Sequence, residues 1–176
     1  MSADASDVGS PGLPLISVVM PCFNSERYLR EAVQSVLGQS HGNVELIVVN
    51  DGSTDGSGAI LSELAAEHPQ RISVFDTNRA GPYPARNVGL RHARGEFIAF
   101  LDADDWWLPE ALARLYAALL EHGVDIAYCG WQNVGESIQS APHVPPAYED
   151  EDPVAHFVRT CPWPIHAKWA TGSSSS

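Results

Sequence analysis

Five short apolar runs, rich in β-branched residues, recur along the chain. Short and nearly continuous hydrophobic runs of this kind are typical of strands that are buried on both faces of a parallel sheet. We therefore expect strands at residues 15–20, 44–49, 72–75, 97–101 and 124–128.

The segments between these runs carry apolar residues at helical spacing. The first, Leu29 to Leu37, follows Ser25 as a candidate N-cap and stops at Gly38. The other expected helices cover residues 60–65, about 84–92 and 112–120. Alternating strands and helices predict an α/β fold, Rossmann-like, with a mostly parallel sheet, helices on both faces and ligands at the carboxyl ends of the strands.

Composition narrows the function classes. The 176 residues include 22 Asp and Glu against 10 Lys and Arg, a net charge of −12, which argues against non-specific nucleic-acid binding. The three cysteines form no C-x-x-C pair, so neither a zinc site nor redox chemistry is indicated. No apolar run is long enough to span a bilayer and the first residues lack a signal-peptide pattern, so we expect a cytoplasmic protein, with peripheral attachment at the inner membrane face left open.

Polar segments follow four of the expected strands: "PCFN", "NDGSTDGS", "DTNRAGPYPARNVG" and "DADD". In a doubly wound parallel sheet these turns lie along one edge, so residues distant in sequence converge on one crevice. We therefore expect the functional site there.

Within "DADD", Asp102 and Asp104 are two residues apart and would project to the same side if strand geometry continued past Leu101. Two such charges at ~4 Å repel by about 4 kcal/mol at an effective dielectric near 20. A divalent cation, Mg²⁺ or Mn²⁺, would relieve this repulsion and attract phosphate oxygens. Alternatively, Asp104 and Asp105 cap the following helix. The neighbouring Trp106 and Trp107 favour a pocket wall over a plain turn.

The other turns offer four candidate ligand contacts, each with a structural alternative. Asp51 could accept a hydrogen bond from a nucleobase or serve turn chemistry, and Arg86 could grip a phosphate or form a surface ion pair. Phe23 could stack on a base or belong to the core, and Asn24 could contact a ligand or cap a helix. No dinucleotide fingerprint or P-loop is present.

Three stretches together resemble the nucleotide-sugar-binding half of the family 2 glycosyltransferases, which have the GT-A fold: "ISVVMPCFNSERYLREAVQSVLGQS", "ELIVVNDGSTDGS" and "PARNVGLRHARGEFIAFLDADDWWLPEAL". The resemblance implies that Phe23 and Asp51 lie near the base and Arg86 near the diphosphate. It places Asp102 and Asp104 on the D-x-D motif, which binds ribose or sugar and holds Mn²⁺ or Mg²⁺. The implied substrate-binding residues are Pro21, Phe23, Asn24, Asp51, Arg86, Asp102, Ala103 and Asp104, with Asp104 and Asp102 at the metal.

By the same resemblance, the chain is a metal-dependent inverting glycosyltransferase. It would transfer a sugar from a nucleoside diphosphate sugar, most simply a UDP-sugar, to a saccharide or lipid-linked acceptor. A homo-oligomer stays open. A non-catalytic nucleotide-sugar-binding module is the alternative, and phosphatase chemistry on Asp102 a weaker third.

The resemblance also divides the chain. It implies a donor-binding core at 15–130, followed by an incomplete acceptor-side region at 131–170. The sequence outside these regions predicts a disordered segment at 1–14 and a flexible tail at 171–176. The family's general base follows the D-x-D motif at a distance. The acidic run Glu149 to Asp152 is a weak candidate for this base, since such a run is more typical of a solvated loop, and His166 is a weak candidate for a third metal ligand.

Overall fold

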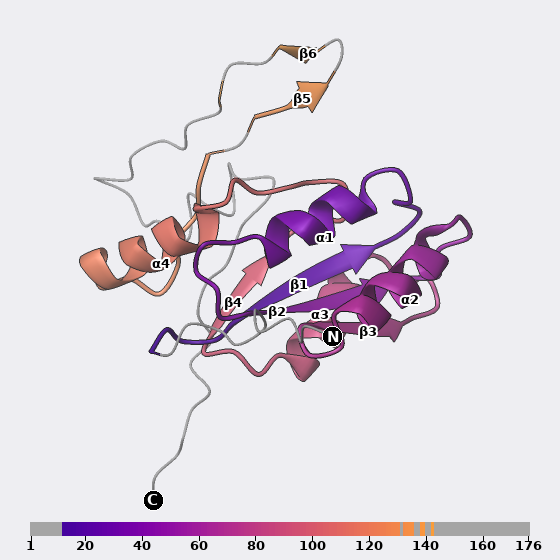
Figure 1. Ribbon diagram of the computed structural model, residues 1–176, viewed down its shortest axis with the longest axis horizontal. Helices are drawn as coiled ribbons and strands as arrows, with labels where there is room; N and C mark the ends of the chain where they lie inside the picture. The colour runs from indigo at the N-terminus through magenta and orange to yellow at the C-terminus, as the bar shows by residue number, and fades with distance from the viewer. Residues whose placement is uncertain (1–11, 131, 136–137, 140–141, 143–176) are drawn as a thin grey trace, which may run out of the picture.

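The computed structural model describes residues 12–130, 132–135, 138–139 and 142. Four parallel strands form the main sheet in the order β3-β2-β1-β4, and a small antiparallel pair, β5 with β6, follows (Figure 1). The strands are β1 (Ile16–Cys22), β2 (Val44–Asn50), β3 (Ile72–Asp76), β4 (Phe97–Phe100), β5 (Val134–Gly135) and β6 (Ile138–Gln139). The helices are α1 (Leu29–Leu37), α2 (Ser57–Glu67), α3 (Pro82–His92) and α4 (Ala111–His122).

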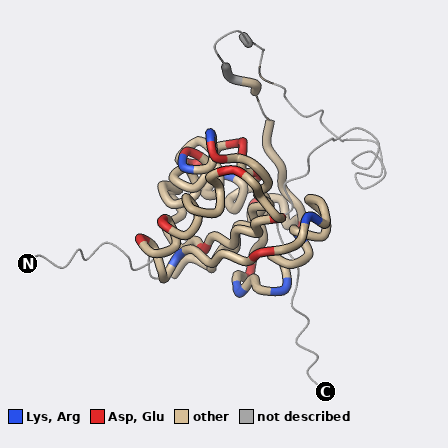
Figure 2. Tube along the Cα trace, turned by 90° about the vertical axis from the view of Figure 1, so that its right-hand side faces the viewer, with Lys and Arg blue, Asp and Glu red and all other residues tan. Residues whose placement is uncertain are grey.

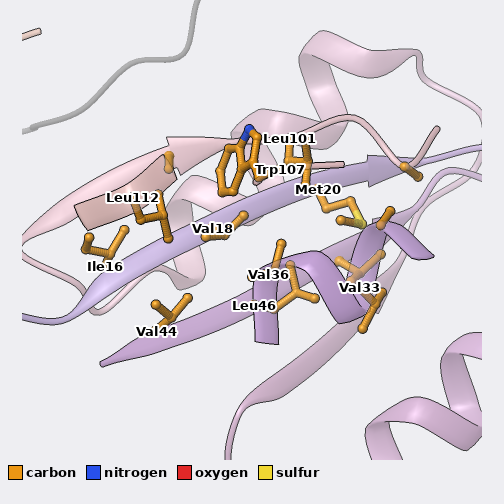
Figure 3. Packing of buried hydrophobic residues seen from close by; sticks show 14 of the residues in the cluster. Ile16, Val18, Met20, Val33, Val36, Val44, Leu46, Leu101, Trp107 and Leu112 are labelled. Atoms are coloured by element: carbon orange, nitrogen blue, oxygen red, sulfur yellow. The ribbon is translucent and has the colours of Figure 1, made fainter. Parts of the chain in front are cut away.

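One face of the sheet packs against α1, α2 and α4, and this interface forms the hydrophobic core. Alternate residues of β1 and β2 point into it, including Val18, Met20 and Leu46, where they meet Val33 and Val36 of α1 (Figure 3). Strands that are buried along their whole length explain why the apolar runs are continuous rather than alternating.

The opposite face of the sheet is covered by α3, which contacts β1 and β2. Gly89 allows this close approach, because a Cβ on Gly89 would collide with the Val19 side chain. The expected arrangement, a mostly parallel sheet with helices on both faces, is therefore confirmed.

Most of the expected elements are present, with two corrections. The run at 124–128 forms no strand: Val124 and Ile126 are each 43 % exposed, and only Ala127 of the apolar residues there is buried. Ser25 does not cap α1 through its side chain, because its hydroxyl donates to the Phe23 carbonyl while its own carbonyl accepts from the backbone amides of Tyr28 and Leu29. The expected 1–14, 131–170 and 171–176 segments lie largely outside the described residues and stay predictions.

Candidate functional site

The carboxyl ends of β1, β2 and β4 lie together because β1 pairs with β2 on one side and with β4 on the other. Phe23 and Asn24 follow β1, Asp51 follows β2, and Asp102 follows β4. The α3 helix, which carries Arg86, begins after the loop that leaves β3. The crossover connections therefore bring the four polar segments to one edge of the sheet, as expected.

Asn24 fastens the loop after β1 to the loop after β2. The side-chain Oδ1 of Asn24 accepts a hydrogen bond from the backbone amide of Thr54 at 2.8 Å. The backbone amide of Asn24 donates to the Ser53 hydroxyl at 3.0 Å. Its φ of 50° is a left-handed conformation that asparagine tolerates better than most residues. Asn24 therefore positions the neighbouring Phe23, and a direct contact with substrate stays a prediction.

Asp51 is buried, and both of its carboxylate oxygens accept hydrogen bonds from one short segment after β3. Oδ1 accepts from the Thr77 hydroxyl and the Ala80 amide, both at 2.7 Å, and Oδ2 accepts from the Gly81 amide at 2.6 Å. Burial alone would raise the pKa of Asp51, but these three donors outweigh it and the pKa lies below its ordinary value. Asp51 is therefore an ionised anchor for residues 77–81.

Phe23 is 37 % exposed, which excludes the core alternative. The guanidinium of Arg79, from the segment that Asp51 holds, lies 4.7 Å from the centroid of the Phe23 ring. Sequence reasoning assigned no role to Thr77 or Arg79. The sequence shows Arg79 only as a basic residue in a polar turn after an expected strand. Its contact with Phe23 depends on the fold, so the sequence alone could not predict it.

Arg86 of α3 pairs with Asp102, with 2.5 Å between Nη2 and Oδ1, and both side chains are mostly shielded from solvent. Burial raises the pKa of Asp102 and repulsion from Asp104 adds to this, while the Arg86 charge and hydrogen bond oppose it without cancelling it. The Arg86 guanidinium also lies over the ring of Tyr83, 5.7 Å from its centroid. Two residues to which the resemblance assigned separate roles thus form one ion pair.

Asp104 is exposed and makes no hydrogen bond or ion pair to another described residue. Neither it nor Asp105 caps a helix, because α4 begins only at Ala111, with Glu110 at its N-cap position. The pKa of Asp105 is raised by desolvation and by the charges of Asp104 and Asp102. Arg86 offsets the negative charge of Asp102 but not that of Asp104 and Asp105. Among the described residues, this edge therefore keeps an excess of negative charge.

A divalent cation fits this charge pattern, although the protein would supply only part of its ligands. Among the described residues, no three His, Cys, Asp or Glu side chains gather closely enough to hold a metal. Mg²⁺ and Mn²⁺ sites that use one or two carboxylates and complete the shell with water and phosphate oxygens need no third side chain. Along the described part of the trace, Arg positions are interspersed with Asp and Glu positions (Figure 2).

The remaining expected site residues are placed as follows. Pro21 is buried within β1, one position beyond the expected strand, and Ala103 is buried in the core. The two tryptophans differ: Trp107 packs in the core, whereas Trp106 is 42 % exposed, so only Trp106 is available as a pocket wall. The candidate base run 149–152 and His166 lie outside the described residues.

Comparisons with known proteins agree with the resemblance. The family profile "Glycosyl transferase family 2" matches residues 17–173. The chain is similar to "Glycosyltransferase GlyA" of Streptococcus pneumoniae serotype 4, with 39 % identity over 122 residues, which are 69 % of this chain and 17 % of that protein.

Two solved structures share the fold. "S. aureus TarS 1-349 in complex with UDP-GlcNAc" superposes with a TM-score of 0.63 at 32 % identity, covering 72 % of this chain and 37 % of that one. "Mannosyltransferase PcManGT from Pyrobaculum calidifontis in complex with GDP-Man and Mn2+" gives 0.63 at 27 % identity, covering 72 % and 38 %. The fold is thus the GT-A fold, and the chain spans less than two fifths of each of these three relatives. No helix among the described residues has the length and hydrophobicity to cross a membrane.

Proposed function

Because this chain is a member of glycosyl transferase family 2, we propose that it transfers a sugar from a nucleoside diphosphate donor to an acceptor hydroxyl, with the help of a divalent cation. The observation that carries the proposal is the exposed Asp104 carboxylate, which pairs with no other described residue and lies two residues beyond Asp102 of the Asp102–Arg86 pair, at the carboxyl edge of the sheet. Ligands of open α/β sheets bind at this edge.

The donor would lie across the ends of the strands. Phe23 offers an exposed ring on which a base can stack, and Asp51, at the adjacent strand end, offers a carboxylate for a base N–H. Arg86 is the cation proposed to meet the diphosphate, because the planar guanidinium matches phosphate geometry and can bind it bidentately. A UDP-sugar is the donor we expect first, and TarS, with 32 % identity, has been solved with UDP-GlcNAc.

Asp104, with Asp102 beside it, would hold the cation. When bound, Mn²⁺ or Mg²⁺ stabilises negative charge on a leaving diphosphate. The residues themselves contribute orientation: Arg86 holds Asp102 in place, and Asp102 in turn keeps the guanidinium at the sheet edge. PcManGT, with 27 % identity, has been solved with GDP-Man and Mn²⁺, which supports cation use in this fold.

Displacement with inversion also requires a base that takes the proton of the acceptor hydroxyl. Asp102 is paired with Arg86 and Asp104 is assigned to the cation, so both are poorly suited to this role. The acceptor, a saccharide or a lipid-linked sugar in this proposal, would be selected elsewhere in the protein.

A second candidate is a module that binds a nucleotide sugar without turnover. It is favoured by one observation: among the described residues at this edge, Asp102 is paired with Arg86 and Asp104 is assigned to the cation, which leaves neither of them to act as the base. Release of sugar from the donor in the presence of Mn²⁺ would decide for the enzyme, and cation-dependent binding without release would decide for the module.

Calorimetry tests the shared core of both candidates. The chain is titrated with UDP, GDP and dTDP, with and without Mn²⁺, and the titrations are repeated with Asp104→Ala and with the control Asp125→Ala. Asp125 is an exposed acid of the same charge, located after α4. We expect cation-dependent binding that Asp104→Ala weakens at least about tenfold and Asp125→Ala leaves unchanged. Binding that is equal with and without Mn²⁺ would refute the role of the cation.

A further inference from the structure

One loop covers both residues that the proposed function assigns to the nucleobase. Residues 77–81, which connect β3 to α3, place the Arg79 guanidinium 4.7 Å from the centroid of the Phe23 ring. The same five residues supply all three donors, Thr77, Ala80 and Gly81, that occupy the carboxylate of Asp51. A base that stacks on this face of Phe23 would need the position that the Arg79 guanidinium now fills.

The loop is firmly seated at its base and exposed at its tip. Its amides and the Thr77 hydroxyl reach a buried carboxylate, and Gly52 lies under it so closely that a Cβ there would be 3.1 Å from the Arg79 amide. At the tip, Asn78 and Arg79 are exposed, and Arg79 has a left-handed φ of 45°, a conformation that costs energy for a residue with a Cβ. Neither Asn78 nor Arg79 supplies any of the three hydrogen bonds that hold the loop on Asp51.

We infer that Arg79 is an internal competitor of the nucleobase: the 77–81 loop holds its guanidinium on the ring face of Phe23, and the loop tip must swing away before a base can stack there. The inference rests on the proposed function, because it presupposes a nucleotide at this edge. It makes Arg79 a residue that sets nucleotide affinity by withholding the binding-competent arrangement, which lowers apparent affinity in proportion to the competent fraction.

Charge and competition predict opposite results for Arg79→Ala. Nucleoside diphosphates are anions, so removing a cation near their site should weaken binding if charge alone mattered. Competition predicts tighter binding. An exposed cation–π contact corresponds to about a two- to fivefold change in equilibrium, so we expect UDP with Mn²⁺ to bind about two- to fivefold more tightly to the variant. Alanine keeps a Cβ at position 79, so the backbone strain of the left-handed φ is unchanged.

Two matched controls isolate this effect. Arg91→Ala removes an exposed arginine in the last turn of α3 and measures the general effect of one lost positive charge. Asn78→Ala alters an exposed side chain of the same loop without touching the ring contact. We expect neither to tighten UDP binding. Inorganic pyrophosphate with Mn²⁺ has no base, so Arg79→Ala should not tighten its binding either.

Stopped-flow binding of UDP with Mn²⁺ supplies the second readout. If the loop tip must open first, Arg79→Ala raises the association rate by the same two- to fivefold factor and leaves dissociation unchanged. Weaker or unchanged UDP affinity would overturn the inference, as would a gain that appears in dissociation alone. In those cases the parent still binds UDP and the proposed function stands. If the parent binds none of UDP, GDP and dTDP with Mn²⁺, the proposed function and this inference both fail.

Discussion

The sheet carries a carboxylate–arginine pair at each of its two edges, and the two pairs are built differently. At the amino edge, Glu45 of β2 pairs with Arg94, 2.6 Å apart, near the start of β4. At the carboxyl edge, Asp102 pairs with Arg86 at 2.5 Å. The residue types and the distances are alike, so the contrast between the pairs comes from what surrounds each carboxylate.

Glu45 is fully provided with donors. Its Oε1 accepts from the Ser17 hydroxyl at 2.5 Å and the Arg94 amide at 2.8 Å, and its Oε2 accepts from the Arg94 guanidinium. The Ser17 hydroxyl in turn accepts from the Gly95 amide at 2.7 Å. Burial alone would raise the pKa of Glu45, but these donors and the Arg94 charge lower it below its ordinary value. The ionised carboxylate is therefore a structural lock between strands.

The Asp102 carboxylate accepts a hydrogen bond from Arg86 and has an acidic neighbour, Asp104; burial and the Asp104 charge raise its pKa. Its ionised form is less stable in the folded protein than in water. A cation bound at the carboxyl edge would therefore stabilise the ionised form of Asp102, whereas the ionised form of Glu45 is already stabilised by its own donors. A perturbed carboxylate of this kind is typical of functional sites.

Breaking the amino-edge lock should have the largest effect on stability. Glu45→Ala leaves the buried Ser17 hydroxyl and the Arg94 amide without their acceptor, while Arg94, which is 69 % exposed, can turn to solvent. We expect a loss of about 2–3 kcal/mol in the free energy of unfolding, measured by urea denaturation. Glu96→Ala, an exposed acid in the same region, is the control and should change little. Equal effects of the two variants would contradict the lock.

Gly95→Ala attacks the same lock through the backbone. A Cβ at position 95 would lie 2.6 Å from the Ser17 amide nitrogen and 2.8 Å from the Leu15 carbonyl oxygen, both of them backbone atoms that cannot turn aside. We expect a loss of about 1–3 kcal/mol, with the thermal midpoint as the measurement. A midpoint equal to that of the parent would mean that the start of β4 is less constrained than its contacts indicate.

The pH dependence of stability should separate the two pairs by sign. Glu45 has a lowered pKa, so its contribution is fully present above pH 4.5, the ordinary value, and is lost as the pH falls through its folded-state pKa. Asp102 has a raised pKa, so its contribution declines as the pH rises from 3.8 through the higher folded-state value. In urea denaturation across acidic pH, Glu45→Gln should flatten the acid loss, and Asp102→Asn should remove a slope of the opposite sign. Slopes of the same sign would contradict the assignments.

Asp102→Asn should have the smallest effect on stability and a marked effect on binding. Replacing a poorly solvated, repelled carboxylate by a neutral amide should change the free energy of unfolding by less than about 1 kcal/mol, in either direction. The same change should weaken Mn²⁺-dependent binding of UDP in calorimetry, because Arg86 loses its partner and the cation loses a nearby charge. A strongly destabilised Asp102→Asn variant would contradict this prediction, because the Asp102–Arg86 pair would then stabilise the fold as the Glu45–Arg94 pair does.

Much of the fold could be predicted from local pattern. The strands at 16–22, 44–50, 72–76 and 97–100 are mainly apolar, and β1 and β2 are buried along their whole length because the sheet is covered on both faces; that signature is visible without coordinates. The same signature misled at 124–128, because an apolar run forms a strand only if it finds an edge to pair with, and its exposed Val124 and Ile126 did not. Pairing is a property of the whole chain.

The sequence by itself determined which chemistry gathers at the carboxyl edge, since parallel strands bring their following turns together in any fold of this class. Only the tertiary structure decided which partners those residues take: that Arg86 neutralises Asp102, that Asp51 holds the 77–81 loop, and that Arg79 covers Phe23. The physical reason is the separation in sequence over which each interaction acts. Hydrophobic periodicity and turn residues act between near neighbours, whereas these hydrogen bonds and ion pairs need polar groups 16 to 30 residues apart to meet within about 3 Å.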